Sequence, residues 1–188
     1  IVTLFVMSDE FREPNKEIIK VFIYGIIITF FAFIFNTYLY EIYLSRSIDK
    51  KLIESFLTAA PVEEGLKFLV LFFLVYRMKD FNEPLDGIVY GICVSLGFAT
   101  LENIFYVYFK EFNYDQIYVS LARSISAIPA HGVFGVFMGY FFMKFAFLNK
   151  NKKGNLFLCF FVPFLLHGTY NFLITEFLII ALLFILIA

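Results

Sequence analysis

One stretch decides the fold of this chain, residues 60–75, which reads Ala60-Pro61-Val62-Glu63-Glu64-Gly65-Leu66-Lys67-Phe68-Leu69-Val70-Leu71-Phe72-Phe73-Leu74-Val75. Two adjacent carboxylates and a lysine stand at the head of an otherwise apolar run. In water, Glu63 and Lys67 would form an ordinary i,i+4 pair on a helix surface. The run, however, has the character of a membrane span, where an ionisable group costs at least about 2.5 kcal/mol. Three such groups within five residues indicate a functional site or an internal partner.

The composition places the whole chain in a membrane. Of its 188 residues 61% are hydrophobic, 29 are Phe, and the mean hydropathy is +0.83, whereas a soluble domain is nearer half apolar. The net charge of −1 argues against nucleic acid as a partner. The two cysteines, Cys93 and Cys159, lie inside apolar runs, fit no metal-finger spacing and are expected to be packing residues.

Apolar runs separated by short polar segments predict an all-α, polytopic membrane helix bundle. About five full spans are expected, at Val21–Tyr43, Ser55–Tyr76, Gly87–Phe109, Val119–Leu148 and Leu156–Thr175. Ile1–Met7 and the run after Thr175 are apolar but shorter than the roughly 20 residues that a span needs. We therefore expect residues 1–188 to be a single transmembrane domain of a multi-pass cell-membrane protein, truncated at both termini.

The basic residues of the loops predict the orientation of the spans. One side of the membrane receives nine, namely Arg12, Lys16, Lys20, Arg77, Lys79, Lys144, Lys150, Lys152 and Lys153. The other side receives four, namely Arg46, Lys50, Lys51 and Lys110. Because positive charge marks the cytoplasmic side, the loops at Leu44–Glu54 and Lys110–Tyr118 are predicted to be extracytoplasmic.

Several polar groups fall inside the predicted spans: Glu63, Glu64, Lys67, Glu102, Asn103, Arg123, His131, His167 and Asn171. Counted at about 1.5 Å per residue, Glu102, His131 and His167 lie about 10–18 Å below the outer ends of their helices. The set predicts one water-filled polar pocket in the outer half of the membrane. Taken singly, each group has a plainer interpretation: a lone His or Asn can simply bond a neighbouring helix, and Arg123 can snorkel to the surface.

The motifs of known intramembrane enzymes narrow the possible types of active site. The sequence has no His-Glu-x-x-His helix, no Gly-x-Gly-Asp, and no Gly-x-Ser-x-Gly elbow around Ser95, Ser124 or Ser126. A site of Glu and His remains. A carboxylate can act as a general base, while imidazole and amide groups can stabilise an oxyanion. The same Glu and two His could instead hold Zn²⁺ with an open water position, and spacing alone does not separate these alternatives.

Five segments together resemble the PrsW family of intramembrane proteases, distant relatives of the CAAX prenyl endopeptidases. They are Pro61–Lys67, Glu83–Gly91, Gly97–Asn103, Arg123–His131 and His167–Phe172, and Phe11–Pro14 resembles the family's entry segment. The match covers nearly the whole chain. It implies a membrane-embedded endopeptidase whose substrate is a single-span membrane protein, such as an anti-sigma factor, cut near its extracytoplasmic boundary.

The resemblance also implies roles for individual residues. Glu63 and Glu64 would be the essential acidic pair, His131 and His167 the essential imidazoles, and Asn171 an oxyanion partner. In the CAAX relatives the second Glu pairs with a basic residue further along the helix, here Lys67, which stands one position earlier than the relatives' Arg.

We predict that Glu63 is the general base on a water also held by His131, and that Lys67 holds Glu64. His167 and Asn171 would stabilise the oxyanion, and Glu102, Asn103 and Arg123 would support the site. A site without a required cofactor is preferred. Zinc on Glu63, His131 and His167 is the alternative, since the family has been called both glutamic-type and metallo-type. The rival function is an ion- or proton-coupled transporter.

Overall fold

The computed structural model describes residues 13–44, 48–109, 115–148, 150–174 and 178–187, and most of these residues are helical, with no strand among them. The α-helices are α2 (Asn15–Leu44), α3 (Lys50–Leu52), α4 (Ala60–Phe73), α5 (Pro84–Tyr108), α6 (Gln116–Ile125), α7 (Ala127–Phe147), α8 (Lys152–Ile174) and α9 (Leu178–Ile187). A π-helical segment η1 (Ile53–Ala59) precedes α4, and a 3₁₀ turn η2 (Val75–Arg77) follows it.

Four helical segments in the described part of the chain are long and apolar enough to cross a membrane. They are Asn15–Leu44, Pro84–Tyr108, Gln116–Phe147 and Lys152–Ile174. A multi-pass helical membrane bundle is thereby confirmed. The expected span Ser55–Tyr76 is instead built from η1, α4 and η2, and Val119–Leu148 is divided into α6 and α7 by a turn at Ser126. The short apolar stretch Ile1–Met7 lies outside the described residues.

Pro61 explains why the helix changes its winding just before the Glu pair. Proline has no N–H, and its ring clashes with the carbonyl four residues earlier. The backbone upstream is wound as a π-helix, so that the N–H of Ala60 bonds the carbonyl of Ser55, five residues back. Thr58 satisfies carbonyls in the widened turn by donating to Ile53 and Glu54. Regular α-helix begins at Ala60 and carries Glu63, Glu64 and Lys67 on its buried side.

The start of α5 is fixed by a capping box. Asp86 accepts from the backbone N–H groups of Asn82 (2.7 Å) and Glu83 (2.8 Å), and Pro84 occupies the first turn. The helix therefore begins three residues before the expected span Gly87–Phe109. This cap sets the register in which α5 presents its glycines and Glu102.

Glycines allow α5 and its neighbours to cross at very short distance. A Cβ placed on Gly139 of α7 would lie 2.2 Å from the carbonyl oxygen of Gly87, and one on Gly91 would lie 2.5 Å from that of Gly135. A Cβ on Gly97 would lie 2.0 Å from the carbonyl oxygen of Phe22 on α2. Small residues permit such close packing of helices in membranes.

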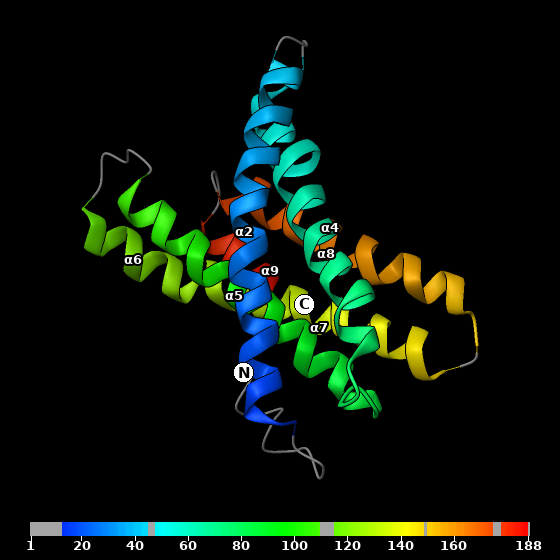
Figure 1. The fold of residues 1–188 in the computed structure, drawn as a ribbon. Coiled ribbons are helices and arrows are strands. Elements are labelled where there is room, and N and C mark those ends of the chain that lie inside the picture. The colour runs from blue at the N-terminus through cyan, green and yellow to red at the C-terminus, as the bar shows by residue number, and fades with distance from the viewer. Residues whose placement is uncertain (1–12, 45–47, 110–114, 149, 175–177, 188) are drawn as a thin grey trace.

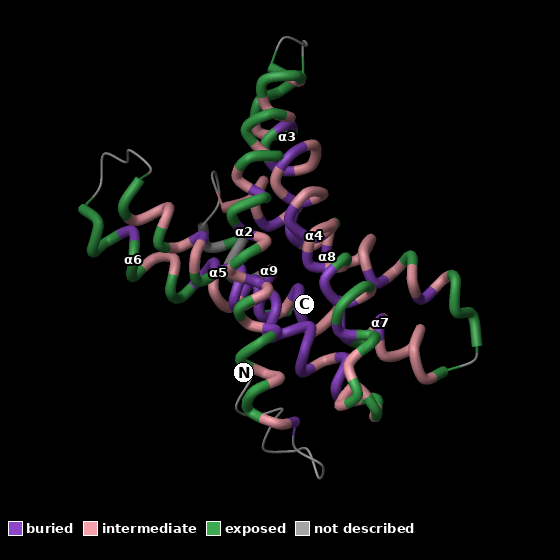
Figure 2. Tube along the Cα trace, in the orientation of Figure 1, coloured by how far each residue is buried: buried purple, intermediate pink, exposed green. Residues whose placement is uncertain are grey.

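The helices meet in a cross. The pair α2 and α4 runs steeply in Figure 1, while α5, α7 and α8 cross it in an adjoining layer, and contacts join α2 to α4 and α5, α5 to α7, and α8 to α4 and α7. Buried residues gather where the two groups cross (Figure 2). The outer face of α2, by contrast, exposes apolar side chains such as Ile27 and Phe30, as a lipid-facing helix does.

Candidate active site

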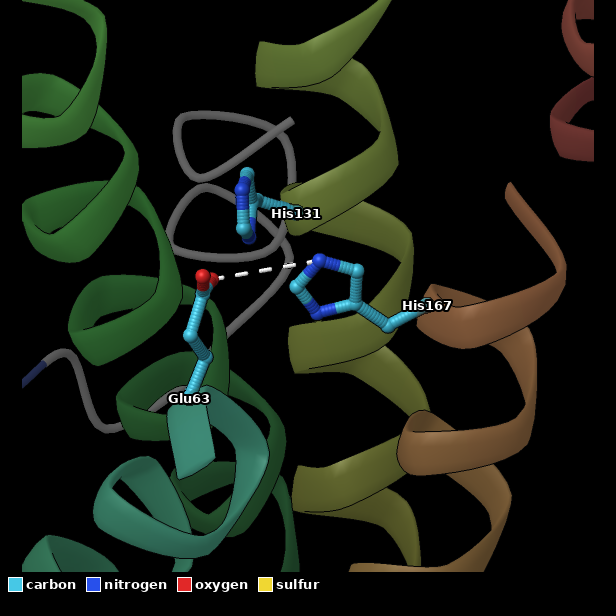
Figure 3. A group of neighbouring side chains, drawn as sticks. All are labelled: Glu63, His131 and His167. Carbon is cyan, nitrogen blue, oxygen red and sulfur yellow. Dashed lines mark ion pairs between the residues drawn. The ribbon is translucent and has the colours of Figure 1, made fainter. Parts of the chain in front are cut away.

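Three predicted site residues from three helices converge at the crossing. Glu63 of α4, His131 of α7 and His167 of α8 each offer one ligand atom, and these atoms lie within 4.8 Å of one another (Figure 3). Their exposed fractions are only 4%, 3% and 2%. The sequence predicted a water-filled pocket in the outer half of the membrane. The structure instead encloses these groups among packed helices.

Glu64 connects α4 to α8. Its Oε1 accepts from Lys67 Nζ at 2.7 Å and from His167 Nδ1 at 2.7 Å. Because an ionised carboxylate only accepts, His167 Nδ1 carries the proton, and in neutral His167 the Nε2 atom carries the lone pair. Phe134 stacks on the His167 ring at 5.1 Å between centroids and holds it in this orientation.

His131 is engaged through both ring nitrogens. Lys67 Nζ lies 3.0 Å from its Nδ1, and Glu102 Oε2 lies 3.0 Å from its Nε2. The ammonium can only donate, so Nε2 carries the proton and donates to Glu102. Arg123 then ion-pairs with Glu102 at 2.7 Å, so it is not free to snorkel, and its Nε donates to Asn103 at 2.6 Å. The supporting residues thus form one continuous network.

Glu63 is the carboxylate without a matching cation. Lys67 compensates Glu64, and Arg123 compensates Glu102. Within the described part of the chain, the Oε1 atom of Glu63 accepts only from the Asn36 amide, at 3.3 Å. Its Oε2 atom is buried without a hydrogen bond and lies 3.9 Å from His167 Nε2, the pair joined by the dashed line in Figure 3. Glu63 Oε2 and His167 Nε2 therefore face each other with free acceptor capacity.

Asn171 is not joined to this group. It lies one helical turn after His167 on α8 and is half-buried, and among the described residues its side chain makes no hydrogen bond. Its predicted place next to the reacting atoms therefore depends on helix position alone.

Asn36 was not among the site residues predicted from the sequence. This residue is the only amide on α2 beyond Asn15, in a largely apolar span. A polar amide in that position is itself an indication of an internal partner, and it continues the spacing of the buried residues Val21, Gly25, Thr29 and Ala32.

The donor atoms fit a metal ion in part. Zinc in catalytic sites takes three protein ligands and a water. Glu63 Oε2 and His167 Nε2 are free to bind, and the Nδ1–H of His167 already donates to a carboxylate, as is usual for metal-binding His. His131 would first have to release Lys67 or Glu102. The three residues are thus able to hold zinc, after one local rearrangement.

Comparison with known proteins gives the family. The family described as "PrsW family intramembrane metalloprotease" matches residues 13–188. The chain belongs to the PrsW family. It is 35% identical to Protease PrsW of Geobacillus kaustophilus over 175 residues (93% of this chain, 74% of the relative) and 34% identical to Protease PrsW of Bacillus subtilis over 178 residues (94% and 78%).

A third relative, Protease PrsW of Clostridioides difficile, is 36% identical over 165 residues, which cover 87% of this chain and 69% of the relative. No solved structure matches the chain. Membership of the PrsW family places the chain among intramembrane proteases and favours this function over the transporter that the polar groups alone left open.

Proposed function

We propose that this chain hydrolyses a peptide bond of a single-span membrane protein, with a water activated between Glu63 and His167. The observation that carries the proposal is the pair of buried acceptors, Glu63 Oε2 and His167 Nε2, 3.9 Å apart. Two acceptors at that separation can both accept from one water, at about 2.8 Å each. A water held in this way has its lone pairs free for attack.

The proposed reaction uses Glu63 as both base and acid. The water oxygen attacks the scissile carbonyl carbon while its proton passes to Glu63 Oε2. Glu63 then gives that proton to the leaving nitrogen as the C–N bond breaks. Lys67 balances the charge of Glu64, and Arg123 balances that of Glu102. Protonation of Glu63 therefore leaves the whole network without net charge.

The other residues then hold Glu63's partners in place. Glu64 fixes the tautomer of His167, so His167 accepts from the water rather than stabilising the oxyanion as the sequence led us to expect. His131, bonded on both nitrogens, joins the Lys67 and Arg123 ion pairs rather than holding the water. The amide of Asn171, one turn beyond His167, is the proposed donor to the oxyanion.

Zinc remains an alternative at the same place. Held by Glu63, His131 and His167, it would supply Lewis-acid polarisation and a more acidic bound water. We favour the site without metal because His131, the third donor, is already bonded on both ring nitrogens. The Lys67 ammonium, next to His131, also disfavours a second cation there.

The depth of the site suggests where the substrate is cut. By the orientation predicted from the loop charges, Glu63, His131 and His167 lie in the outer half of the membrane. A substrate helix must unwind before its carbonyl can be attacked, and water near an interface satisfies the freed backbone groups. Cleavage is therefore proposed close to the substrate's extracytoplasmic boundary, at helix-breaking residues.

A synthetic single-span reporter tests the proposal. It would carry an epitope at each end and a Gly-Pro pair at its outer boundary, and would be co-expressed with the wild type or with Glu63→Gln. Mass spectrometry of the fragments should locate the cut near that pair, and only with the wild type. A cut at the cytoplasmic end, or equal cleavage by both proteins, would overturn the proposal.

A further inference from the structure

Asn36 lies on the one face of α2 that turns into the protein. The buried residues of α2 are Val21, Gly25, Thr29 and Ala32, and Asn36 follows Ala32 by four residues, on the same side of the helix. Thr29 shows which way this face points, because its hydroxyl contacts the carbonyl of Phe98 on α5 at 3.2 Å. The neighbouring residues Phe35 and Tyr38 are exposed, at 48% and 65%, as lipid-facing side chains are.

The amide of Asn36 reaches the uncompensated carboxylate of the site. Its Nδ2 lies 3.3 Å from Glu63 Oε1, and no other hydrogen bond reaches Glu63 from the described residues. The contact joins α2 to α4 directly at the reacting group. Since a carboxylate accepts and does not donate, the nitrogen of the amide is the atom that must face it.

We propose that Asn36 is a positioning residue for Glu63, an inference that rests on the proposed function of that carboxylate. The amide fixes Oε1 and so turns Oε2 toward His167 Nε2. Without it, the Glu63 side chain would have no hydrogen bond to hold it in a single rotamer. The water would then be bound by a carboxylate that moves.

The pattern of contacts distinguishes this role from simple attachment of two helices. A buried Asn that only joins helices is expected to have hydrogen-bond partners for both its amide nitrogen and its amide oxygen. Asn36 donates to the reacting carboxylate alone, while its own Oδ1 is buried without a hydrogen-bond partner. Asn36 Oδ1 and Glu63 Oε2 are thus both left with free acceptor capacity beside the same site, where they can accept from the water or from the substrate N–H.

The test compares Asn36→Leu, which removes the donor, with Asn36→Gln, which keeps it. Thr37→Val is the matched control, since Thr37 is the next residue, is exposed, and bonds only the Phe33 carbonyl of its own helix. Each variant is purified in detergent, and cleavage of the single-span reporter is measured. Misplaced reacting groups cost on the order of 100-fold in rate. We expect Asn36→Leu to lower kcat about 10- to 100-fold with little change in KM, Asn36→Gln to recover most of the loss, and Thr37→Val to behave as the wild type.

The outcomes separate this inference from the proposed function. Wild-type kcat in Asn36→Leu, together with an inactive Glu63→Gln, would overturn the role of Asn36 only. Equal loss in the Leu and Gln variants, with unchanged melting temperatures, would also overturn it, because the donor would then be irrelevant. Full activity of Glu63→Gln, or no cleavage by the wild type, would overturn both. Should Asn36→Leu fail to fold, Asn36→Ala takes its place with the same expectations.

Discussion

Replacement of Lys67 by Met would test whether the buried ion pairs hold the site together. Lys67 and Glu64 are fully buried on α4, with Nζ 2.7 Å from Oε1. The same ammonium lies 3.0 Å from His131 Nδ1 and 4.5 Å from the centre of the Phe98 ring. Met fills a similar volume without charge, so the substitution leaves Glu64 as a buried carboxylate without a compensating cation, bonded only by His167.

The structure sets the expected size of the effect. Breaking a buried pair by removing one partner costs about 3–5 kcal/mol of stability. The control is Lys20→Met, since Lys20 pairs with Glu17 at 3.0 Å but its side chain is 44% exposed. An exposed pair of that kind contributes at most about 1 kcal/mol. The two lysines have partners at the same i,i+3 spacing, and burial is the difference.

Unfolding in detergent, followed by circular dichroism, measures both changes. Lys67→Met should be several kcal/mol less stable than the wild type, while Lys20→Met should be nearly unchanged. Glu64→Gln added to Lys67→Met should recover much of the loss, because the uncompensated charge is then gone. A Lys67→Met protein as stable as Lys20→Met, or a double variant no better than the single, would refute the reasoning.

Three further predictions follow from other contacts. Gly139→Ala should destabilise the folded protein by about 1–3 kcal/mol, because its Cβ would meet the Gly87 carbonyl oxygen at 2.2 Å. Gly65→Ala is the control and should fold normally, because the nearest contact of its Cβ would be Phe160 at 3.8 Å. Thermal melts of the two variants compare their stabilities. Burial raises the pKa of Glu13, outside the spans, to about 8 from 4.5, and nearby Asp86 adds to the shift. The folded state thus keeps a proton that the unfolded state releases above pH 4.5, so stability should fall between pH 4.5 and 8 and Glu13→Gln should flatten that slope. Element analysis of active protein should find no stoichiometric zinc; zinc lost with activity on chelation, and restored with it, would contradict this.

Much of the architecture could be predicted from the sequence because bilayer thickness and backbone geometry constrain it directly. Apolar runs separated by polar segments predicted most of the spans. The pairing of Lys67 with Glu64 follows from positions three apart on one helix. These features are local or depend on one helix at a time.

Contacts between helices could not be predicted in the same way. Whether Asn36 reaches Glu63, 27 positions away, depends on how α2 and α4 are rotated and tilted against each other. The tautomer of His167 likewise depends on the partner its Nδ1 finds on α4. Hydropathy also does not show the π-helical winding ahead of Pro61, because the number of apolar residues in a run does not depend on how the backbone is wound.

The central claim is that Glu63 activates the attacking water, and the single-turnover cleavage rate of purified Glu63→Gln in lipid vesicles tests it most directly. The amide keeps the shape of the side chain and can still contact Asn36, but it cannot take the proton. A general base contributes about 10²–10⁴-fold, so the rate should fall by at least about 100-fold, while Glu17→Gln, a carboxylate on α2 paired with Lys20, should leave the rate unchanged. A Glu63→Gln rate within a few-fold of the wild type would contradict the account.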